Sequence, residues 1–243
     1  MKIIKLEEID STNNFAKDFL LKNNPSEDII IFTKSQTKGR GTGQNSWYCE
    51  KENSLIFSLI TFPNINASDF FKLNIIISLS IVKYLETKGI SAKVKWTNDI
   101  YVGDKKICGI LIENIIELGI ITKSIIGIGL NVNGLSFPDN LPNPISMQQI
   151  TDENYILEGE LLQLFKILND DLKHNLGLNF DDLKIFYLQK MFRYNEFHWF
   201  RNTKTDKIFE GKIINIEEFG KIIILNIQNQ TQSFDFKEIE FLI

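Results

Sequence analysis

Charged and amide side chains gather around one predicted β-hairpin in the middle of the chain. Residues 93–114 read KVKWTNDIYVGDKKICGILIEN, with strands expected at 100–102 and 107–113. Glycine at the first position of the Gly103-Asp104 turn is typical of a type II′ hairpin, because that position requires a positive φ. The hairpin brings together a set of polar side chains: Lys95, Asn98, Asp99, and either Lys105 or Lys106. This set suits the binding of an anion and a metal ion, and a solvated hairpin with surface lysines is the alternative.

A second polar segment is the glycine-rich loop at 35–47, which reads SQTKGRGTGQNSW. Lys38 and Arg40 alternate with glycines there, so backbone N–H groups and cations can surround an anion. The spacing matches neither a Walker loop nor a dinucleotide fingerprint, which would need a glycine where Gln44 stands. A mobile surface loop is the alternative interpretation.

Two further segments carry polar groups at the ends of predicted elements. Ser11-Thr12-Asn13 stands where a helix is expected to begin, and this position suits either an N-cap or an anion site. In the strand predicted at 121–132, Gly127 and Gly129 indicate either a bulge or the close approach of a backbone or a ligand. Asn131 follows at the end of that strand.

Taken together, these segments indicate a nucleotide-using transferase or ligase. The cationic loops suit a polyphosphate, Asp99 suits Mg²⁺, and Trp47 offers a flat face for a base or ring. His174 and His198 lie far from these motifs in the sequence, so a Ser-His-Asp triad has no candidate base.

The elements that position these groups form an α+β pattern. Apolar runs predict strands, and apolar residues at helical spacing predict helices. The strands besides the hairpin are expected at 3–9, 28–34, 54–61 and 121–132, and the helices at 11–22, 67–88, 152–175 and 181–194, with an irregular loop at 134–150. From Phe197 to Ile243 the chain contains only short strands with regularly spaced turns, which favours a small appended barrel.

Composition places the chain among ordinary globular proteins. It has 243 residues, 43% hydrophobic content and a formal net charge of −4, without the basic surface that nucleic-acid binding requires. No signal peptide and no membrane-spanning run are predicted. Two cysteines without metal-ligand spacing favour reduced thiols and make a structural zinc site unexpected. A cytoplasmic protein is the expectation.

A family resemblance rests on motifs that follow one another at similar spacing along most of the chain. The chain resembles biotin–protein ligases in this order and over these residues: Ser11-Thr12-Asn13, Gln36 to Gly41, Asn45-Ser46-Trp47, Lys95 to Asp99, Lys106 with Gly109 to Glu113, and Gly127 to Asn131.

The resemblance implies a fold and an activity. It implies a catalytic domain at 1–194, related to class II aminoacyl-tRNA synthetases with helices on a mixed sheet, and an SH3-like domain at 195–243. It implies that biotin and ATP, with Mg²⁺ as activator and no tightly bound prosthetic group, give biotinyl-5′-AMP and pyrophosphate. The biotinyl group then passes to a lysine of a biotin carboxyl carrier protein. A monomer or homodimer without membrane binding is expected. DNA binding is not expected, because the chain starts directly at the catalytic domain.

The resemblance also assigns roles to individual residues. It implies that Arg40, Lys106 and Asp99 are catalytic, with Asp99 also a Mg²⁺ ligand and, as a hypothesis, the general base for the incoming amine. The implied biotin contacts are Ser11, Thr12, Asn13, Gln36, Arg40, Gly41, Thr42, Lys106 and Gly109. The implied ATP or adenylate contacts are Trp47, Lys95, Asn98 and Asn131.

The chain departs from the family pattern at two places. Thr42-Gly43-Gln44 replaces a more cationic stretch, which predicts a weaker grip on the adenylate, and Thr97 replaces a proline, which predicts a looser turn. Two alternatives stay open at this point. One is a lipoate ligase, although the Arg-Arg-x-x-Gly-Gly-Gly run expected there is missing from the sequence. The other is a biotin sensor without catalysis.

Overall fold

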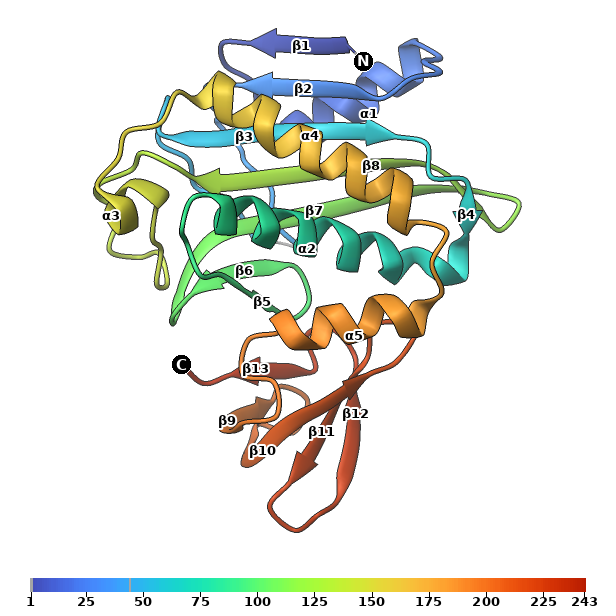
Figure 1. Ribbon diagram of the computed structural model, residues 1–243, viewed down its shortest axis with the longest axis vertical. Helices are drawn as coiled ribbons and strands as arrows, with labels where there is room; N and C mark the ends of the chain where they lie inside the picture. Colours follow the sequence, from blue (N-terminus) through green and yellow to red (C-terminus); the bar gives the residue numbers. More distant parts are fainter. Residues whose placement is uncertain (1, 44) are drawn as a thin grey trace.

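The chain folds into two β-sheets with helices, described here from a computed structural model over residues 2–43 and 45–243. Gln44, which belongs to one of the family departures, lies outside the described residues. The larger sheet carries most of the helices, and the smaller sheet forms the lower end of the molecule in Figure 1. The expected α+β architecture is confirmed.

The larger sheet has eight strands in the order β1-β2-β3-β8-β7-β6-β5, with β4 paired to β8. It is mixed, because β1 and β2 are parallel and the other pairs are antiparallel. The strands are β1 (Lys2–Leu6), β2 (Ile29–Thr33), β3 (Ser54–Thr61), β4 (Ile65–Asn66), β5 (Lys93–Lys95), β6 (Asp99–Val102), β7 (Lys105–Glu117) and β8 (Ile120–Asn131). Every residue of β2 and β3 is buried, as expected for apolar runs covered on both faces.

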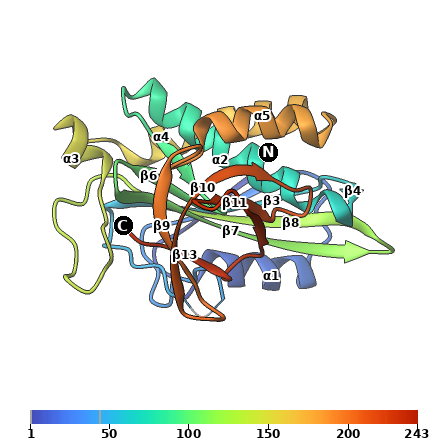
Figure 2. The same cartoon turned by 90° about the horizontal axis from the view of Figure 1, so that it is seen from below.

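Helices cover both faces of this sheet. Figure 2 shows α1 on one side and α2 and α5 on the other. The helical elements are α1 (Thr12–Lys22), η1 (Ala67–Asp69), α2 (Phe70–Thr87), α3 (Met147–Thr151), α4 (Leu157–Asn175) and α5 (Phe180–Lys190). A small apolar cluster around Ala16 fills the layer under α1, and the main core lies between the sheet and the other helices. The sheet is therefore packed on both faces.

Several predicted boundaries differ from the structure. The strand predicted at 3–9 is β1 and ends at Leu6, the strand predicted at 107–113 is β7 and is longer at both ends, and three further differences concern helices. Part of the loop predicted at 134–150 forms α3, whose start has a capping box between Ser146 and Gln149. The helix predicted from 152 begins at Leu157, because Asp152 adopts a left-handed backbone that ends α3. The helix predicted to reach 194 ends at Lys190, because the following chain turns extended and Phe192 donates its N–H to Val94 in β5.

The smaller sheet has five antiparallel strands in the order β12-β11-β10-β9-β13. They are β9 (Phe197–Asn202), β10 (Lys207–Ile216), β11 (Ile222–Asn226), β12 (Thr231–Phe234) and β13 (Ile239–Phe241). The prediction that the end of the chain is a small β domain is confirmed.

Specific contacts fix the smaller sheet against the larger one. Trp96, in the loop before β6, donates its indole N–H to the carbonyl of Gly220 at 2.8 Å. Gly220 has φ +79°, and a Cβ there would lie 2.5 Å from the ring of Phe71 on α2. Arg193 donates to the carbonyl of Leu242 at 2.9 Å. The two sheets are therefore held together beside the predicted hairpin.

The cysteines are both free thiols. Complete burial raises the pKa of Cys108, which makes its thiol a poor nucleophile. Over residues 2–43 and 45–243, no helix combines the length and the apolar character needed to cross a bilayer.

The close packing at Gly220 predicts a stability difference between two glycine variants. Gly220→Ala and Gly119→Ala both place a side chain on a backbone with positive φ, but the Cβ at Gly119 meets open space. We expect Gly220→Ala to lower the free energy of unfolding by about 1–3 kcal/mol more than Gly119→Ala, because Phe71 must shift. Urea unfolding of the two variants measures this difference, and equal losses would contradict the packing argument.

Candidate active site

One cavity of about 530 Å³ collects nearly all the predicted site residues. Its volume lies in the range of small-molecule sites. Its wall contains these predicted residues: Ser11, Thr12, Asn13, Gln36, Arg40, Gly41, Thr42, Trp47, Lys95, Asn98, Asp99, Lys106 and Gly109. They come from the start of α1, the glycine-rich loop and the hairpin, so the fold brings together segments that are far apart in the sequence.

Asn131 is the predicted site residue that the structure does not bring to this cavity. It is buried, and its amide nitrogen donates to the carbonyl of Ile145 at 3.1 Å. Its polar group is thus directed to the connection between β8 and α3. The structure lends no support to the predicted contact of Asn131 with adenine.

A hydrogen-bonded group closes the end of the cavity at the start of α1. Ser11 occupies the N-cap position without a side-chain capping bond. The backbone N–H of Thr12 donates to Gln36 Oε1 at 2.8 Å. Ser58 Oγ lies 2.8 Å from Thr12 Oγ1 and 2.6 Å from Asn13 Oδ1. Ser58 was not predicted from the sequence, where its signal was a serine in the middle of the apolar strand SLIFSLIT.

Glu113 on β7 organises the cationic groups next to Asn13. Arg40 Nη2 and Nη1 lie 3.0 and 3.2 Å from the two carboxylate oxygens of Glu113. Asn13 and Lys17 donate to the same carboxylate at 2.8 and 2.9 Å, and Arg40 also donates to Asn14. Burial raises the pKa of Glu113, but these hydrogen bonds outweigh it and lower the pKa overall, so the carboxylate is ionised at neutral pH. Glu113 belongs to the family motif at Gly109 to Glu113, but its sequence context predicted no role for it.

The glycines of β7 and β8 allow side chains to lie directly on the sheet. A Cβ at Gly129 would be 2.4 Å from the indole of Trp47, and one at Gly109 would be 2.8 Å from the same ring. A Cβ at Gly127 would be 2.3 Å from Asn13 Oδ1. The glycines predicted to mark a bulge or a close approach therefore mark a close approach, and what approaches is the side chains of Asn13 and Trp47.

The hairpin supplies two lysines and a carboxylate to the opposite part of the cavity. Lys106 pairs with Asp99 at 2.7 Å, while Lys105 lies outside the cavity wall. Of the two lysines left open by the sequence, Lys106 is therefore the one at the site. Burial lowers the pKa of Lys95, and the nearby carboxylate of Asp99 partly opposes that shift. An anionic ligand would favour the charged form of Lys95.

Thr42 and Thr97, at the two places where the chain departs from the family pattern, each take part in a neutral hydrogen bond. Thr42 Oγ1 accepts from the amide nitrogen of Asn98 at 2.8 Å, which ties the glycine-rich loop to the hairpin. The carbonyl of Thr97 accepts from the hydroxyl of Tyr187 at 3.2 Å. The turn at Thr97 is thus anchored to α5.

The smaller sheet completes the cavity wall, which the sequence analysis did not foresee. Lys95 Nζ lies 5.4 Å from the ring centre of Phe241, so the hairpin and β13 meet at the wall. A Cβ at Gly43 in the loop would touch the ammonium end of Lys237. The wall residues from β13 and from the loops of this sheet are Thr203, Phe236, Lys237, Ile239, Glu240 and Phe241. No motif signals them, since only the packing of the two sheets brings them to the site.

A magnesium ion fits this wall only together with a nucleotide. Among residues 2–43 and 45–243, no group of three or more His, Cys, Asp or Glu side chains is arranged to hold a metal ion. Mg²⁺ is commonly bound by one or two carboxylates together with substrate phosphates. Asp99 can supply one carboxylate, so its predicted metal contact stays a prediction.

Comparisons with known proteins agree with this geometry. The model of the Biotin/lipoate A/B protein ligase family matches residues 6–131. The bifunctional ligase/repressor BirA of Bacillus spizizenii is 28% identical over 242 residues, which cover 98% of this chain and 73% of that protein. The human biotin–protein ligase is 31% identical over 140 residues, covering 54% of this chain and 19% of that protein.

Solved structures show the same fold over nearly the whole chain. The biotin protein ligase of Aquifex aeolicus in complex with biotin and ATP superposes with a TM-score of 0.80 and 26% identity, covering 98% of this chain and 97% of that one. The biotin protein ligase of Leishmania major in complex with biotinyl-5-AMP has a TM-score of 0.66 at 18% identity and supports the fold alone. The chain belongs to the Biotin/lipoate A/B protein ligase family.

The packing of Trp47 on the sheet predicts the effect of a methyl group at Gly129. Gly129→Ala must displace the indole, and we expect a loss of about 1–3 kcal/mol in the free energy of unfolding together with a change in Trp47 fluorescence. Gly134→Ala is the matched control, because its Cβ would meet its nearest atom at an ordinary 3.4 Å. Urea unfolding and emission spectra, corrected with Trp47→Phe, measure both effects. An unchanged Trp47 signal in Gly129→Ala would contradict the packing.

Proposed function

We propose that this protein is a biotin–protein ligase, which activates biotin with ATP and transfers the biotinyl group to a lysine of a carrier protein. The observation that carries the proposal is one cavity whose wall carries two kinds of group. The start of α1 and Gln36 offer neutral hydrogen-bonding groups, with the Arg40 guanidinium held near Asn13 by Glu113, and the hairpin region offers the ammonium groups of Lys95 and Lys106. The neutral groups suit a ureido ring, and the cations suit a carboxylate and phosphates. The relatives named above support this choice of substrates.

In the first step the biotin carboxylate attacks the α-phosphorus of ATP. A mixed anhydride, biotinyl-5′-AMP, forms, and the bond to pyrophosphate breaks. Two anions must approach each other, so cations placed between them lower the barrier. Arg40 and Lys106 lie on the cavity wall and can supply these cations. Glu113 orients Arg40, and Asp99 orients Lys106. The glycine-rich loop covers the site and keeps water away from the anhydride.

In the second step the amine of the carrier lysine attacks the carbonyl of the adenylate. An amide bond forms, AMP leaves, and the amine loses a proton. Asp99 is the proposed acceptor of that proton, with its carboxylate 2.7 Å from Lys106 in the present structure. Mg²⁺, when bound with the nucleotide, supplies neutralising charge at the phosphates, and Asp99 would hold it.

The partner and the domain division follow from the same proposal. The acceptor is a biotin carboxyl carrier protein domain, which presents one lysine to the open side of the cavity. Residues 1–194 form the catalytic domain and residues 195–243 a separate domain. The latter takes part in catalysis through the wall residues of its sheet, such as Lys237 and Glu240.

Pyrophosphate–ATP exchange tests the first step. We expect exchange with Mg²⁺ and biotin, and background exchange with lipoate or with no acid. Lys106→Met is expected to reduce biotin-dependent exchange by about 100-fold or more, because a transition-state cation is lost. Lys105→Met is the matched control, since Lys105 is the neighbouring lysine outside the cavity wall. Exchange with lipoate alone would replace the proposal with a lipoate ligase, and biotin binding without exchange would indicate a sensor.

Transfer from preformed biotinyl-5′-AMP to a carrier domain tests the proposed role of Asp99. Asp99→Asn keeps the shape of the side chain and removes the base, so we expect a decrease in the transfer rate of about 10²–10⁴-fold. Asp104→Asn, in the turn of the same hairpin, serves as the control. Transfer at the wild-type rate in Asp99→Asn would remove the general-base role and leave the adenylation chemistry intact.

A further inference from the structure

Asn13 has almost no hydrogen-bonding capacity left on its nitrogen. Its carboxamide Nδ2 carries two protons. One is donated to Glu113 Oε2 at 2.8 Å, and the carbonyl of Leu111 lies 3.4 Å from the same nitrogen. An ionised carboxylate can only accept, so Glu113 determines which end of the Asn13 amide is the nitrogen. The amide orientation therefore depends on the charge of Glu113.

Ser58 fixes the other end of the same amide. Its hydroxyl has a single proton and lies 2.6 Å from Asn13 Oδ1 and 2.8 Å from Thr12 Oγ1. The oxygen of Asn13 cannot donate, so the Ser58 proton points to Asn13. The free capacity of Asn13, which lines the cavity, is the second lone pair of Oδ1. Asn13 thus offers a ligand an acceptor and no donor.

Gln36 shows the opposite polarity on the same wall. Its Oε1 accepts from the backbone N–H of Thr12 at 2.8 Å, which directs Nε2 away from α1. A Cβ at Gly39 would lie 2.9 Å from this Nε2, so the amide NH₂ group lies next to the glycine-rich loop. Gln36 lines the cavity, and the N–H groups of Nε2 are the donors that it can offer a ligand there. An acceptor and a donor on one wall match the N–H and C=O groups of a cyclic urea.

We propose that Glu113 and Ser58 are positioning residues that hold Asn13 as an acceptor, and that this fixed polarity selects the ureido ring. The inference rests on the proposed function, because it assigns the ring of biotin to this end of the cavity. Glu113 also pairs with Arg40. The Glu113 side chain therefore orients Asn13 toward the ureido ring and Arg40 toward the carboxylate of biotin. Ser58 and Glu113 act through Asn13 and Arg40 and do not line the cavity wall.

Exchanging the donor and the acceptor between positions 13 and 113 distinguishes a positioning role of Glu113 from a purely structural role. Glu113→Gln removes the fixed acceptor, and we expect it to weaken biotin binding by about 10- to 100-fold, as for hydrogen bonds to charged groups. Asn13→Asp places two carboxylates in contact and is expected to lose at least as much. The double variant, Asn13→Asp with Glu113→Gln, restores the hydrogen bond between the two side chains with donor and acceptor exchanged. The new amide at position 113 would donate to the new carboxylate at position 13, which can only accept. We expect it to bind biotin within about tenfold of the wild type.

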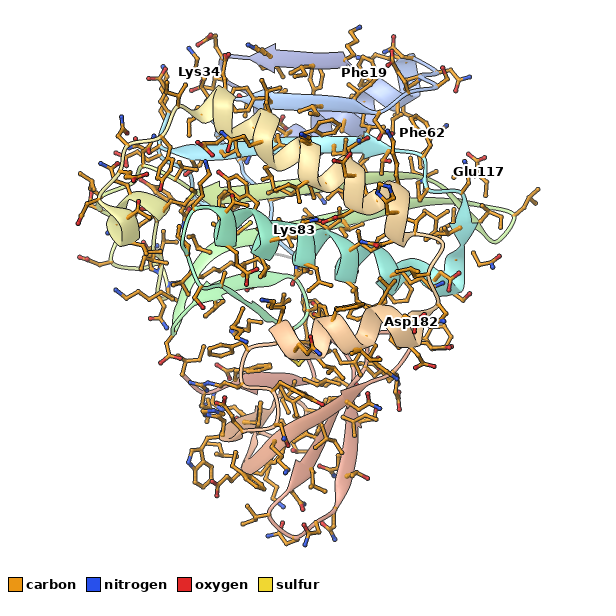
Figure 3. All side chains as sticks on the ribbon, in the orientation of Figure 1. Phe19, Lys34, Phe62, Lys83, Glu117 and Asp182 are labelled. Atoms are coloured by element: carbon orange, nitrogen blue, oxygen red, sulfur yellow. The ribbon has the colours of Figure 1, made fainter. Side chains whose placement is uncertain are left out.

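Biotin affinity is measured by calorimetry on the full chain, and the KM for ATP is measured in the exchange assay. Glu117→Gln is the matched control, since Glu117 lies on the same strand at its far end (Figure 3). Ser58→Ala is a second test without charge change, with an expected loss of about fivefold, typical of a neutral hydrogen bond. The KM for ATP is expected to stay within about threefold in Ser58→Ala. Circular dichroism confirms that each variant is folded.

The outcomes separate the inference from the proposed function. Rescue in the double variant supports the polarity assignment. The polarity assignment would be overturned if the losses in biotin affinity multiplied in the double variant, or if both Glu113→Gln and Ser58→Ala bound biotin with wild-type affinity. Neither outcome would affect the proposed function, which biotin-dependent exchange by the wild type tests separately. A wild-type protein that does not bind biotin would overturn the proposed function and the assignment of the ring with it.

Discussion

The cavity exists because two neighbouring strands lack side chains at one place on the larger sheet. Gly109 of β7 pairs directly with Gly129 of β8, and Gly127 pairs with Leu111 two positions along. The indole of Trp47 and the amide of Asn13 lie on this bare backbone at distances that no Cβ would permit. Protein interiors are close-packed, so the bare surface fixes the depth at which both side chains lie. The other parts of the site are arranged around these two side chains.

Cations gather at the cavity although the whole protein has a formal net charge of −4. Two cations of the site have a carboxylate partner, Glu113 beside Arg40 and Asp99 beside Lys106. Each carboxylate orients its cation before an anion arrives. The smaller sheet then covers the hairpin end, which reduces the exposure of Lys95 and strengthens the charges that act there. A domain remote in sequence is thus part of the wall of the same cavity.

The sequence was sufficient for the elements whose signal is local. The β3 strand and the Gly103-Asp104 hairpin follow from an apolar run and from turn geometry, and these were predicted correctly. At Gly127 and Gly129 the sequence left a bulge and a close approach open, and it did not indicate that side chains approach there. Motif resemblance then located most of the cavity wall. Features that depend on packing between distant segments were not predictable. Among them are Ser58 and Lys237 at the site and the position of Asn131 outside the cavity wall. The helix boundaries predicted near 152 and 194 were wrong. Asp152 has a left-handed backbone that ends α3, and the contact of Phe192 with β5 follows the end of α5 at Lys190.

Direct detection of the reaction intermediate tests the central claim, that one cavity holds biotin and a nucleotide together. The full chain is incubated with biotin, ATP and Mg²⁺, passed through a desalting column, and the bound small molecules are identified by mass spectrometry. The account predicts biotinyl-5′-AMP bound to the protein, absent when either substrate is omitted and strongly reduced in Lys106→Met. Bound biotin and ATP without any adenylate, or no bound ligand at all, would contradict it.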